Sequence, residues 1–492
     1  MAEACSSQNN SRNRKQSKST SRKNFYMKTY RTYNSKPRNF RKKPREKIIQ
    51  EMRDFGYNIV EPGKFAEKYA LSLPYHIFFT RIDESRKTYN QQFSITFPEI
   101  LDISFGEIVN SLHLTYKLDV EWLCLQYLLA GQSTNMTILY GERRDEEELD
   151  DNITAIHMKM PFEFGCHHSK IMILQYKDNG IRVVVSTANL FFEDWQNSTQ
   201  GIWISPHLPR LSKAAKHNGE SLTNFKKDLQ RYLSSYRNPA LKRWRKLVKK
   251  TDFSAINVCL IASIPGHFEH TVDLWGYKKL ANVLSQHVTL PPDALKWSII
   301  AQSSAVGSFG PKYGSWLSKE IVWSMTRETE RDLNNYPKFQ FIYPSVKNYE
   351  QSFDYQNGTS CFSYSREVHS KQQWIKSYLY QWKAARTERD QAMPHIKSYT
   401  RISSDLKRIA WFVLTSANLS KGAWGVQRED DYYITNYEVG IAFLPKFITR
   451  ITTFPITDED LTNSIFPIPY DLPLCPYDSS DSPLITREFL NE

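Results

Sequence analysis

Long apolar runs along the chain predict strands that lie inside covered sheets. Residues 171–176 and 181–185 are almost entirely apolar, and Asp178-Asn179-Gly180 between them is a strong signal for a hairpin turn. Strands that are apolar on both faces belong in the middle of a sheet with cover on both sides. Other strand segments are predicted at 77–79, 93–97, 258–262, 297–302, 409–414 and 437–443.

Helical patterns fall between these strands. Residues 225–233 carry apolar side chains at helical spacing after the candidate cap Ser221. Asn238-Pro239 predicts the start of a second helix, because proline is favoured in the first turn. Further helices are predicted over 318–325 and 371–386, the second from aromatic residues at four-residue spacing.

One motif occurs twice and organises the chain. The first copy runs from Phe164 to Trp195 and the second from His395 to Trp424, and each contains His-x-Lys, an apolar strand and Ala-Asn-Leu. The closing Asn and Trp recur at an offset of 229 positions, and the His at 227. A period this long indicates duplicated domains, since solenoid repeats run at about 20–50 residues. We therefore expect two related halves that each contribute half of one site.

The ends of these halves follow from composition. We place the boundary at Pro265-Gly266, which gives an N-terminal domain over 48–264 and a C-terminal domain over 265–492. Residues 1–47 have almost no aliphatic side chains and cannot bury enough surface to fold alone, so a disordered basic tail is predicted there. Arg41–Lys47 within it suits a nuclear localisation signal.

The net charge of +13 is concentrated in this tail. Residues 1–47 hold 15 Lys or Arg and 2 Glu, which accounts for the whole excess, so the remaining 445 residues are neutral overall. The tail would supply salt-sensitive attraction to a polyanion. The basic residues of the helix after Asn238 have two interpretations, a DNA contact and a solvated helix face, of which the solvated face is the simpler.

Length and composition exclude several classes of protein. The 492 residues, 40% apolar and 14% aromatic, suffice for two or three packed domains. No stretch approaches the roughly 20 apolar residues of a membrane span, and no apolar signal region begins the chain, so we expect neither membrane insertion nor secretion. Six scattered cysteines without a C-x-x-C pair fit a reducing compartment and argue against zinc. For Cys166 a buried structural role is the simpler interpretation and a reactive thiol the alternative.

The repeated polar residues can handle a phosphodiester. Residues i and i+2 of a strand point to the same face, so each His-x-Lys pair projects together, and each Asn follows a neighbouring strand. Lysines and asparagine amides can hold non-bridging oxygens, one neutral imidazole can attack phosphorus and one imidazolium can protonate the leaving oxygen. No metal or other cofactor is required. The residues are His168, Lys170 and Asn189 in the first copy and His395, Lys397 and Asn418 in the second.

The duplicated H-x-K…N pattern resembles the phospholipase D superfamily. It lacks the aspartate that usually follows the lysine by five residues, where Gln175 and Ile402 stand instead. Together with Phe-Gly-x-His-His-x-Lys, Gln-Gly-Ile-Trp, Met-Pro-His-Ile-Lys, Thr-Ser-Ala-Asn-Leu-Ser-Lys and Tyr-Glu-Val-Gly, this departure resembles the tyrosyl-DNA phosphodiesterases over residues 73–475. The resemblance implies an α/β fold of two similar α-β-α sandwich domains with pseudo-twofold symmetry and the site between them.

The resemblance also implies a role for each matching residue. His168 would be the nucleophile that forms a phosphohistidine, and His395 the general acid and then base. Gln200 and Glu438 would orient the histidines. Substrate contacts are implied for Lys170, Lys397, Phe164, Ser308 and Ser420, while Asn189 and Asn418 would hold the phosphate. Ala305 stands where relatives often have serine, and the segment 481–486 lacks an expected tryptophan.

The implied activity is DNA repair: hydrolysis of the bond between a topoisomerase I tyrosine, or another 3′ adduct, and a DNA 3′-phosphate. Expected partners are single-stranded or duplex DNA 3′ ends carrying a phosphotyrosyl peptide, and we expect a monomer in the nucleus. Three alternatives are a broader 3′-end-processing nuclease, a lipid-active member of the superfamily, and a DNA-binding protein with a decayed site. Complete sets of polar residues in both copies argue against the last.

Overall fold

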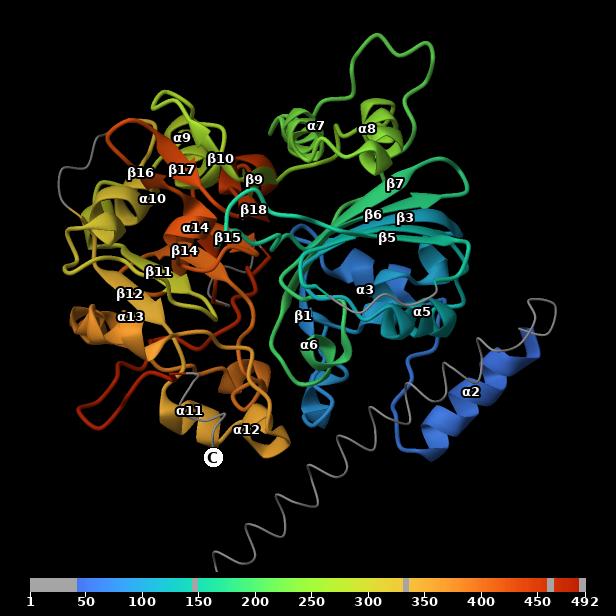
Figure 1. Cartoon of the computed structure of the whole chain (residues 1–492), viewed down its shortest axis with the longest axis horizontal. Coiled ribbons are helices and arrows are strands. Elements are labelled where there is room, and N and C mark those ends of the chain that lie inside the picture. The colour runs from blue at the N-terminus through green and yellow to red at the C-terminus, as the bar shows by residue number, and fades with distance from the viewer. Residues whose placement is uncertain (1–41, 144–148, 331–335, 458–463, 486–492) are drawn as a thin grey trace, which may run out of the picture.

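The fold is a pair of α/β halves with a large sheet in each (Figure 1). This computed structural model describes residues 42–143, 149–330, 336–457 and 464–485. Residues 1–41 of the predicted tail lie outside the described residues, as do residues 144–148.

The first sheet has eight strands in the order β2-β1-β8-β7-β6-β3-β4-β5. Its central strands β6 and β7 form the predicted hairpin, in which Asn179 has a φ of 68°. The strands are β1 Ile77–Thr80, β2 Ser94–Ile95, β3 Ile108–Thr115, β4 Asn135–Tyr140, β5 Ile153–His157, β6 Ile171–Tyr176, β7 Ile181–Ser186 and β8 Gly201–Ile204.

The second sheet follows the order β13-β12-β11-β14-β15-β18-β9, with β19 paired to β15. A small sheet, β10-β17-β16, stands beside it. The strands are β9 Cys259–Ser263, β10 Gly266–Phe268, β11 Ser298–Gln302, β12 Phe339–Ile342, β13 Leu379–Tyr380, β14 Ser398–Ile402, β15 Arg408–Thr415, β16 Val426–Gln427, β17 Tyr432–Ile434, β18 Glu438–Phe443 and β19 Phe454–Pro455.

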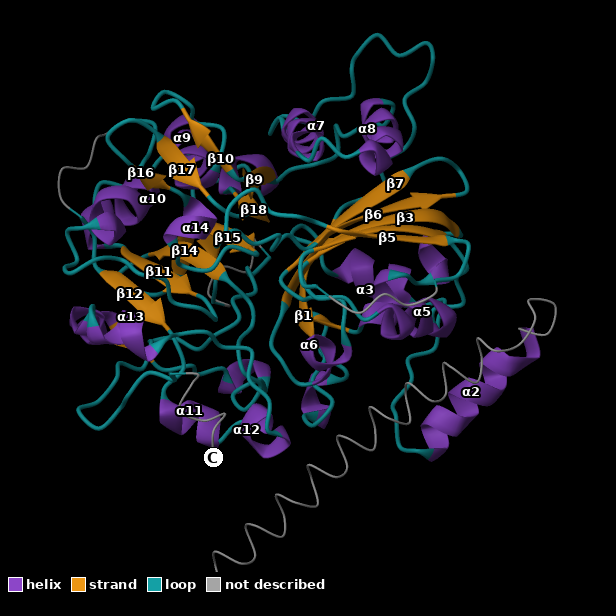
Figure 2. Ribbon diagram, viewed as in Figure 1, coloured by secondary structure: helices purple, strands orange, loops and turns teal. Residues whose placement is uncertain are grey.

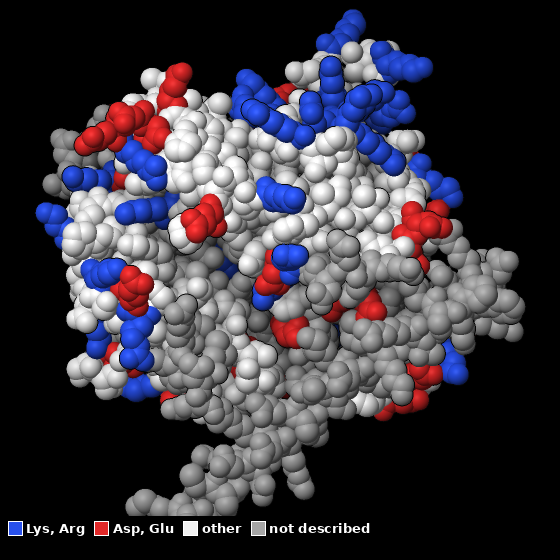
Figure 3. Space-filling model, in the orientation of Figure 1, with Lys and Arg blue, Asp and Glu red and all other residues white. Residues whose placement is uncertain are grey.

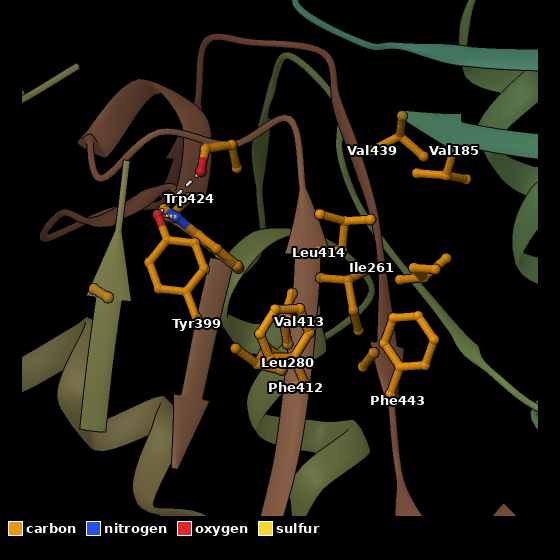
Figure 4. Close-up of a cluster of buried hydrophobic side chains, with 14 of the residues drawn as sticks. Val185, Ile261, Leu280, Tyr399, Phe412, Val413, Leu414, Trp424, Val439 and Phe443 are labelled. Carbon is orange, nitrogen blue, oxygen red and sulfur yellow. Dashed lines mark hydrogen bonds between the residues drawn. The ribbon is translucent and has the colours of Figure 1, made fainter. Parts of the chain in front are cut away.

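The two large sheets repeat one arrangement, as the duplicated motif predicts. Reading β1-β8-β7-β6-β3-β4-β5 against β9-β18-β15-β14-β11-β12-β13 matches strand for strand. Side chains of β7, β9, β15 and β18 meet in one continuous core at the centre of the molecule (Figure 4). The predicted fold class of two similar α/β halves is confirmed.

Helices cover both faces of the first sheet, which explains its continuously apolar strands (Figure 2). Alternate residues of β6 enter two cores: Ile171 and Ile173 pack with α7 and α8, whereas Met172 and Leu174 pack with α2, α3 and α5. The α-helices are α2 Lys42–Asp54, α3 Phe65–Leu71, α4 Phe97–Ile100, α5 Val120–Leu129, α6 Phe192–Gln196, α7 Phe225–Ser235, α8 Lys242–Lys249, α9 Gly276–His287, α10 Trp323–Thr326, α11 Val346–Glu350, α12 Phe353–Asn357, α13 Arg366–Ser370, α14 Lys421–Trp424 and α15 Pro445–Ile448.

Shorter helical turns complete the fold. A π-helical segment, η6 Leu317–Val322, precedes α10 and confirms a helix in the predicted region 318–325. The 3-10 turns are η2 Arg86–Thr88, η3 Ile103–Phe105, η4 Pro239–Leu241, η5 Ala294–Lys296, η7 Gln373–Tyr378 and η8 Ala385–Thr387.

The predicted helix over 371–386 is wrong. Only the turn η7 is helical at its start, and the chain then becomes β13, whose Leu379 pairs in parallel with Phe341 of β12. Pairing with a neighbouring strand overrides the local helical spacing of the aromatic residues. The predicted strand 93–97 is shorter than expected, because Thr96 and Glu99 form a capping box that starts α4.

Two elements, α2 and β9, bear on the predicted domain boundaries. Helix α2 begins at Lys42, inside the predicted tail 1–47, and its residues Ile48 and Met52 are buried against the first half. The division at residues 264–265 stays a prediction. The antiparallel pairing of β9 with β18 favours a boundary before Cys259, since β9 is already part of the second sheet.

Candidate active site

A cavity of about 470 Å³ opens between the two halves, where the repeated motifs meet. His168 precedes β6 and His395 precedes β14, while Asn189 follows β7 and Asn418 follows β15, so equivalent strand ends face one another. All four side chains line the cavity. The structure therefore brings together the candidate residues that lie 229 or 227 positions apart in sequence.

Backbone hydrogen bonds between the halves fix both histidine segments. The N–H of His168 donates to the carbonyl of Tyr437 at 2.9 Å, and the N–H of Tyr437 donates to Cys166 at 3.0 Å. In the second segment the N–H of Ile396 donates to Thr199 at 2.8 Å, and Thr199 donates to Met393 at 2.8 Å. The first His-x-Lys segment is thus held by Tyr437, just before Glu438, and the second by Thr199, just before Gln200.

Glu438 forms a hydrogen bond with His168. Its Oε2 lies 2.9 Å from Nδ1 of His168, and the glutamate is buried. Burial acts to raise the pKa of Glu438, but His168 and the hydroxyl of Ser416 outweigh it and lower that pKa. An ionised carboxylate only accepts, so Nδ1 of His168 carries the proton and Nε2 keeps its lone pair. Burial lowers the pKa of His168 against the opposing effect of Glu438, which favours the neutral ring.

Gln200 contacts the other histidine. Its Oε1 lies 3.1 Å from Nδ1 of His395 and accepts from Thr187 Oγ1 at 2.8 Å, while its Nε2 donates to the carbonyl of Asp194 at 3.2 Å. The bonds to Thr187 and Asp194 fix the orientation of the amide. Burial, with the charges of Lys397 and Lys170, holds the pKa of His395 well below its usual value.

Two hydroxyls hydrogen-bond to Glu438 and Gln200 in the same way. Ser416 Oγ donates to Glu438 Oε2 at 2.6 Å, as Thr187 Oγ1 does to Gln200. Thr187 and Ser416 occupy equivalent positions of the two Ala-Asn-Leu segments, 229 residues apart. Sequence reasoning missed both, although their position within the repeat was a usable signal.

The two lysines are buried beside the histidine backbone and are not among the residues that line the cavity. Lys170 Nζ donates to the carbonyl of His168 at 2.8 Å, and Lys397 Nζ donates to the carbonyl of His395. Burial lowers the pKa of Lys170 to about 8, and burial with the nearby Lys170 charge lowers the pKa of Lys397. Two buried amines with few other partners form a strong site for an anion, because a bound negative charge would offset their desolvation.

The asparagines are held by backbone groups. Asn418 Oδ1 accepts from the N–H groups of Ser304 and Ala305 at 3.1 and 3.0 Å, which leaves its Nδ2 as a donor for a ligand. Asn189 Oδ1 accepts from the N–H of Lys117 at 3.2 Å. The alanine at position 305 therefore keeps its backbone contact, and only a hydroxyl is missing relative to serine.

Asp194 is a site residue that sequence reasoning missed. Its Oδ2 accepts from both the N–H and Nδ2 of Asn189, at 2.6 and 3.0 Å, and lies 3.5 Å from Nδ1 of His395. Burial raises its pKa. The second copy has Ala423 at the equivalent position, so the repeat gave no signal for this carboxylate.

The other predicted contacts lie outside the cavity lining. Phe164 is 85% exposed on the segment before His168, and Ser308 is exposed. Ser420 caps α14 by accepting from the N–H of Ala423. Burial raises the pKa of Cys166 to about 12, so its thiol stays protonated near neutral pH, in agreement with the structural interpretation.

Metal clusters and membrane spans do not occur in the part of the chain that the structure describes. In the described ranges no group of three or more His, Cys, Asp or Glu side chains is placed to hold a metal ion. No helix among the described residues is long and apolar enough to cross a membrane.

Comparisons with known proteins agree with this geometry. The family model of tyrosyl-DNA phosphodiesterase matches residues 76–478. The chain is 40% identical over 452 residues to tyrosyl-DNA phosphodiesterase 1 of Drosophila melanogaster, covering 89% of this chain and 78% of that protein. It is 31% identical over 395 residues to a probable tyrosyl-DNA phosphodiesterase of Caenorhabditis elegans, covering 77% and 82%.

A solved structure shares the fold. The crystal structure of the yeast tyrosyl-DNA phosphodiesterase superposes with a TM-score of 0.63 at 18% identity, covering 83% of this chain and 99% of that chain. The family match spans most of the chain, and both halves of the duplicated site are present in it. This chain therefore belongs to the tyrosyl-DNA phosphodiesterase family.

Proposed function

We propose that this enzyme hydrolyses the phosphodiester between a DNA 3′-phosphate and a tyrosine, such as that of topoisomerase I, through a phosphohistidine. The observation that carries the proposal is the pairing of two histidines from opposite halves on one cavity, each with a different orienting residue. A neutral nucleophile and a proton donor are needed together, and unlike surroundings allow one site to hold both.

His168 attacks first. Its Nε2 forms a bond to phosphorus while the bond from phosphorus to the tyrosine oxygen breaks, and His395 gives that oxygen its proton. Glu438 stabilises the charge that develops on the His168 ring, because its carboxylate accepts from Nδ1. Lys170, Lys397, Asn189 and Asn418 hold the non-bridging oxygens as negative charge grows on them.

Water completes the reaction. His395, now neutral, takes a proton from a water molecule while the oxygen of that water attacks phosphorus. The bond from Nε2 of His168 to phosphorus breaks, and DNA with a 3′-phosphate leaves. Bound phosphate also bears on the first step: its negative charge opposes the Lys397 and Lys170 charges that lower the pKa of His395. Substrate binding thus favours the protonated acid.

Partners and location follow from the family and the chain's charge. The substrate class is a single-stranded or duplex DNA 3′ end carrying a phosphotyrosyl peptide, with Phe164 stacking on the DNA and Ser308 and Ser420 contacting its backbone. A monomer in the nucleus fits this role. A broader 3′-end phosphodiesterase uses the same residues, because the chemistry acts on phosphorus and needs only an oxygen leaving group that His395 can protonate.

The test uses a labelled single-stranded oligonucleotide ending in 3′-phosphotyrosine, with excess EDTA. Wild type should release the 3′-phosphate, and His168→Ala should lose about 10⁴-fold or more in kcat. His157→Ala, at an exposed histidine outside the cavity lining, is the matched control and should keep wild-type activity. Appreciable turnover by His168→Ala, or an EDTA loss that magnesium restores, would sink the proposal.

A further inference from the structure

Helix α8 presents a dense row of positive charge to solvent. Figure 3 shows Lys and Arg side chains gathered over α7 and α8, with little acidic surface among them. No Asp or Glu occurs from Asn238 to Thr251. The exposed basic residues, which we call the α8 face, are Lys242, Arg243, Arg245, Lys246, Lys249 and Lys250.

The apolar side of this helix is already used. Trp244 and Val248 are buried in the core with Leu241, at 1%, 0% and 0% exposure. A helix that inserts into a lipid surface needs a free apolar face, and α8 has none to offer. The exposed side therefore fits a polyanion that stays in water.

The arrangement costs stability where it is not neutralised. Lys242 and Lys246, and likewise Arg245 and Lys249, are like charges at i,i+4 spacing, which destabilises a helix. Among the described residues, no ion pair joins these four side chains to a carboxylate, and the nearby Asp228 of α7 pairs with Arg231 and Lys279 instead. Because the chain beyond residue 47 is neutral overall, this concentration is local.

The α8 face adjoins the catalytic cavity through α7. The hydroxyls of Tyr232 and Tyr236 contact Ser169 Oγ and His167 Nε2, so α7 packs directly behind the His168 segment. The carbonyl of Ser235, at the end of α7, accepts from the hydroxyl of Tyr437 at 3.3 Å.

Tyr437, which is buried, connects the end of α7 to the segment that carries Phe164. Tyr437 also binds Cys166 through its N–H, two residues after the exposed Phe164. Exposed Arg237 lies between α7 and α8.

We propose that the α8 face binds the phosphate backbone of DNA that continues away from the cavity beyond Phe164. An eight-residue helix is about 12 Å long. Duplex DNA carries one charge per about 1.7 Å, so a helix of that length spans about seven phosphate charges. The face would contact backbone only, adding affinity without sequence preference. This inference rests on the proposed function for the direction in which the DNA runs.

The test neutralises the face and a matched set elsewhere. The first variant changes Lys242, Arg245, Lys246 and Lys249 to Gln, sparing Arg243, whose guanidinium donates to Gln175. The control changes four exposed lysines of the second half, Lys296, Lys371, Lys376 and Lys446, to Gln and so removes the same net charge. Fluorescence anisotropy measures binding of duplex DNA with a 3′ overhang and no tyrosine, over a range of salt.

The α8 variant should bind this DNA about tenfold more weakly at low salt. Its slope of log affinity against log salt should become shallower by about 1 for each phosphate that the variant no longer neutralises. The control should match wild type in both affinity and slope. Cleavage of a short 3′-phosphotyrosyl strand, too short to reach α8, should be unchanged in both variants and shows that each is folded.

Unchanged DNA affinity of the α8 variant, or an equal weakening in the control, overturns the inference. Since anisotropy needs no turnover, the result is separable from the proposed function. Wild type that binds DNA through α8 and yet cleaves no phosphotyrosyl strand would leave this inference standing and remove the catalytic proposal.

Discussion

Glu438 of β18 and His168, 270 positions apart, form a hydrogen bond of 2.9 Å across the junction of the two halves. The corresponding position in the other half is held by Gln200, which contacts His395. The duplicated scaffold therefore gives its two histidines one charged and one neutral partner. This difference makes the two copies unequal, and it supports the assignment of nucleophile to the first and acid to the second.

Removing the charge of Glu438 should change how activity depends on pH. Glu438 raises the pKa of His168 against burial, so Glu438→Gln should lower that pKa further. The acidic limb of kcat/KM, where protonation stops His168 from attacking, should move to lower pH, and the plateau should fall by about tenfold or more. A pH profile of kcat/KM for wild type and variant measures both.

The reciprocal change, Gln200→Glu, places a carboxylate beside His395 and should raise its pKa. The basic limb, where the acid loses its proton, should then move to higher pH. A pair of profiles that coincide with wild type at both limbs would contradict the assignment of these partners.

His395→Asn should slow the second step more than the first. Asparagine can neither protonate a leaving group nor deprotonate water, which removes about 10²–10⁴-fold of general acid–base catalysis. Without His395, the tyrosine can still leave, whereas water attacks poorly because no base takes its proton. A covalent protein–DNA adduct should therefore accumulate. Denaturing gels with labelled DNA detect it, and the double variant with His168→Ala should show none.

Asp194→Asn should loosen Asn189 while leaving the fold intact. The carboxylate of Asp194 accepts hydrogen bonds from the N–H and Nδ2 of Asn189. The amide of the variant has one acceptor oxygen fewer, and its NH₂ group places two donors against the donor Nδ2 of Asn189. We expect kcat to fall by about tenfold or more, because a hydrogen bond to a charged group is worth roughly 1.5–3 kcal/mol and about 1.4 kcal/mol corresponds to tenfold in rate. Steady-state kinetics beside a circular dichroism spectrum separates this from unfolding; equal kcat for variant and wild type would remove Asp194 from the site.

Stability should fall as the solution becomes acidic, in part through a histidine outside the site. Burial lowers the pKa of His113 on β3 from 6.5 to about 3, so below pH 6.5 the unfolded chain binds a proton that the folded one excludes. The contribution is complete above pH 6.5 and is lost as pH falls towards 3, at up to about 1.4 kcal/mol per pH unit. Urea denaturation of wild type and His113→Gln over that interval should give a flatter dependence for the variant; parallel curves would show that His113 does not titrate on unfolding.

The sequence by itself determined the strands of both sheet centres and the identity of the paired histidines, lysines and asparagines. Apolar runs such as 171–176 and 409–414 have one stable environment, the covered middle of a sheet, so local pattern is enough. The repeat then points to the chemistry, because two copies of His-x-Lys…Asn are hard to explain by packing alone.

Only the tertiary structure decided which groups surround each histidine. Asp194 has no counterpart in the second copy, and the partners of Glu438 and Gln200 lie in the opposite half of the chain. The same holds for β13, where pairing with β12 replaces a predicted helix, and for β9, which joins the second sheet. These features depend on contacts between residues that are distant in sequence. The local pattern of apolar and polar residues carries no information about such contacts, which form only when the sheets assemble.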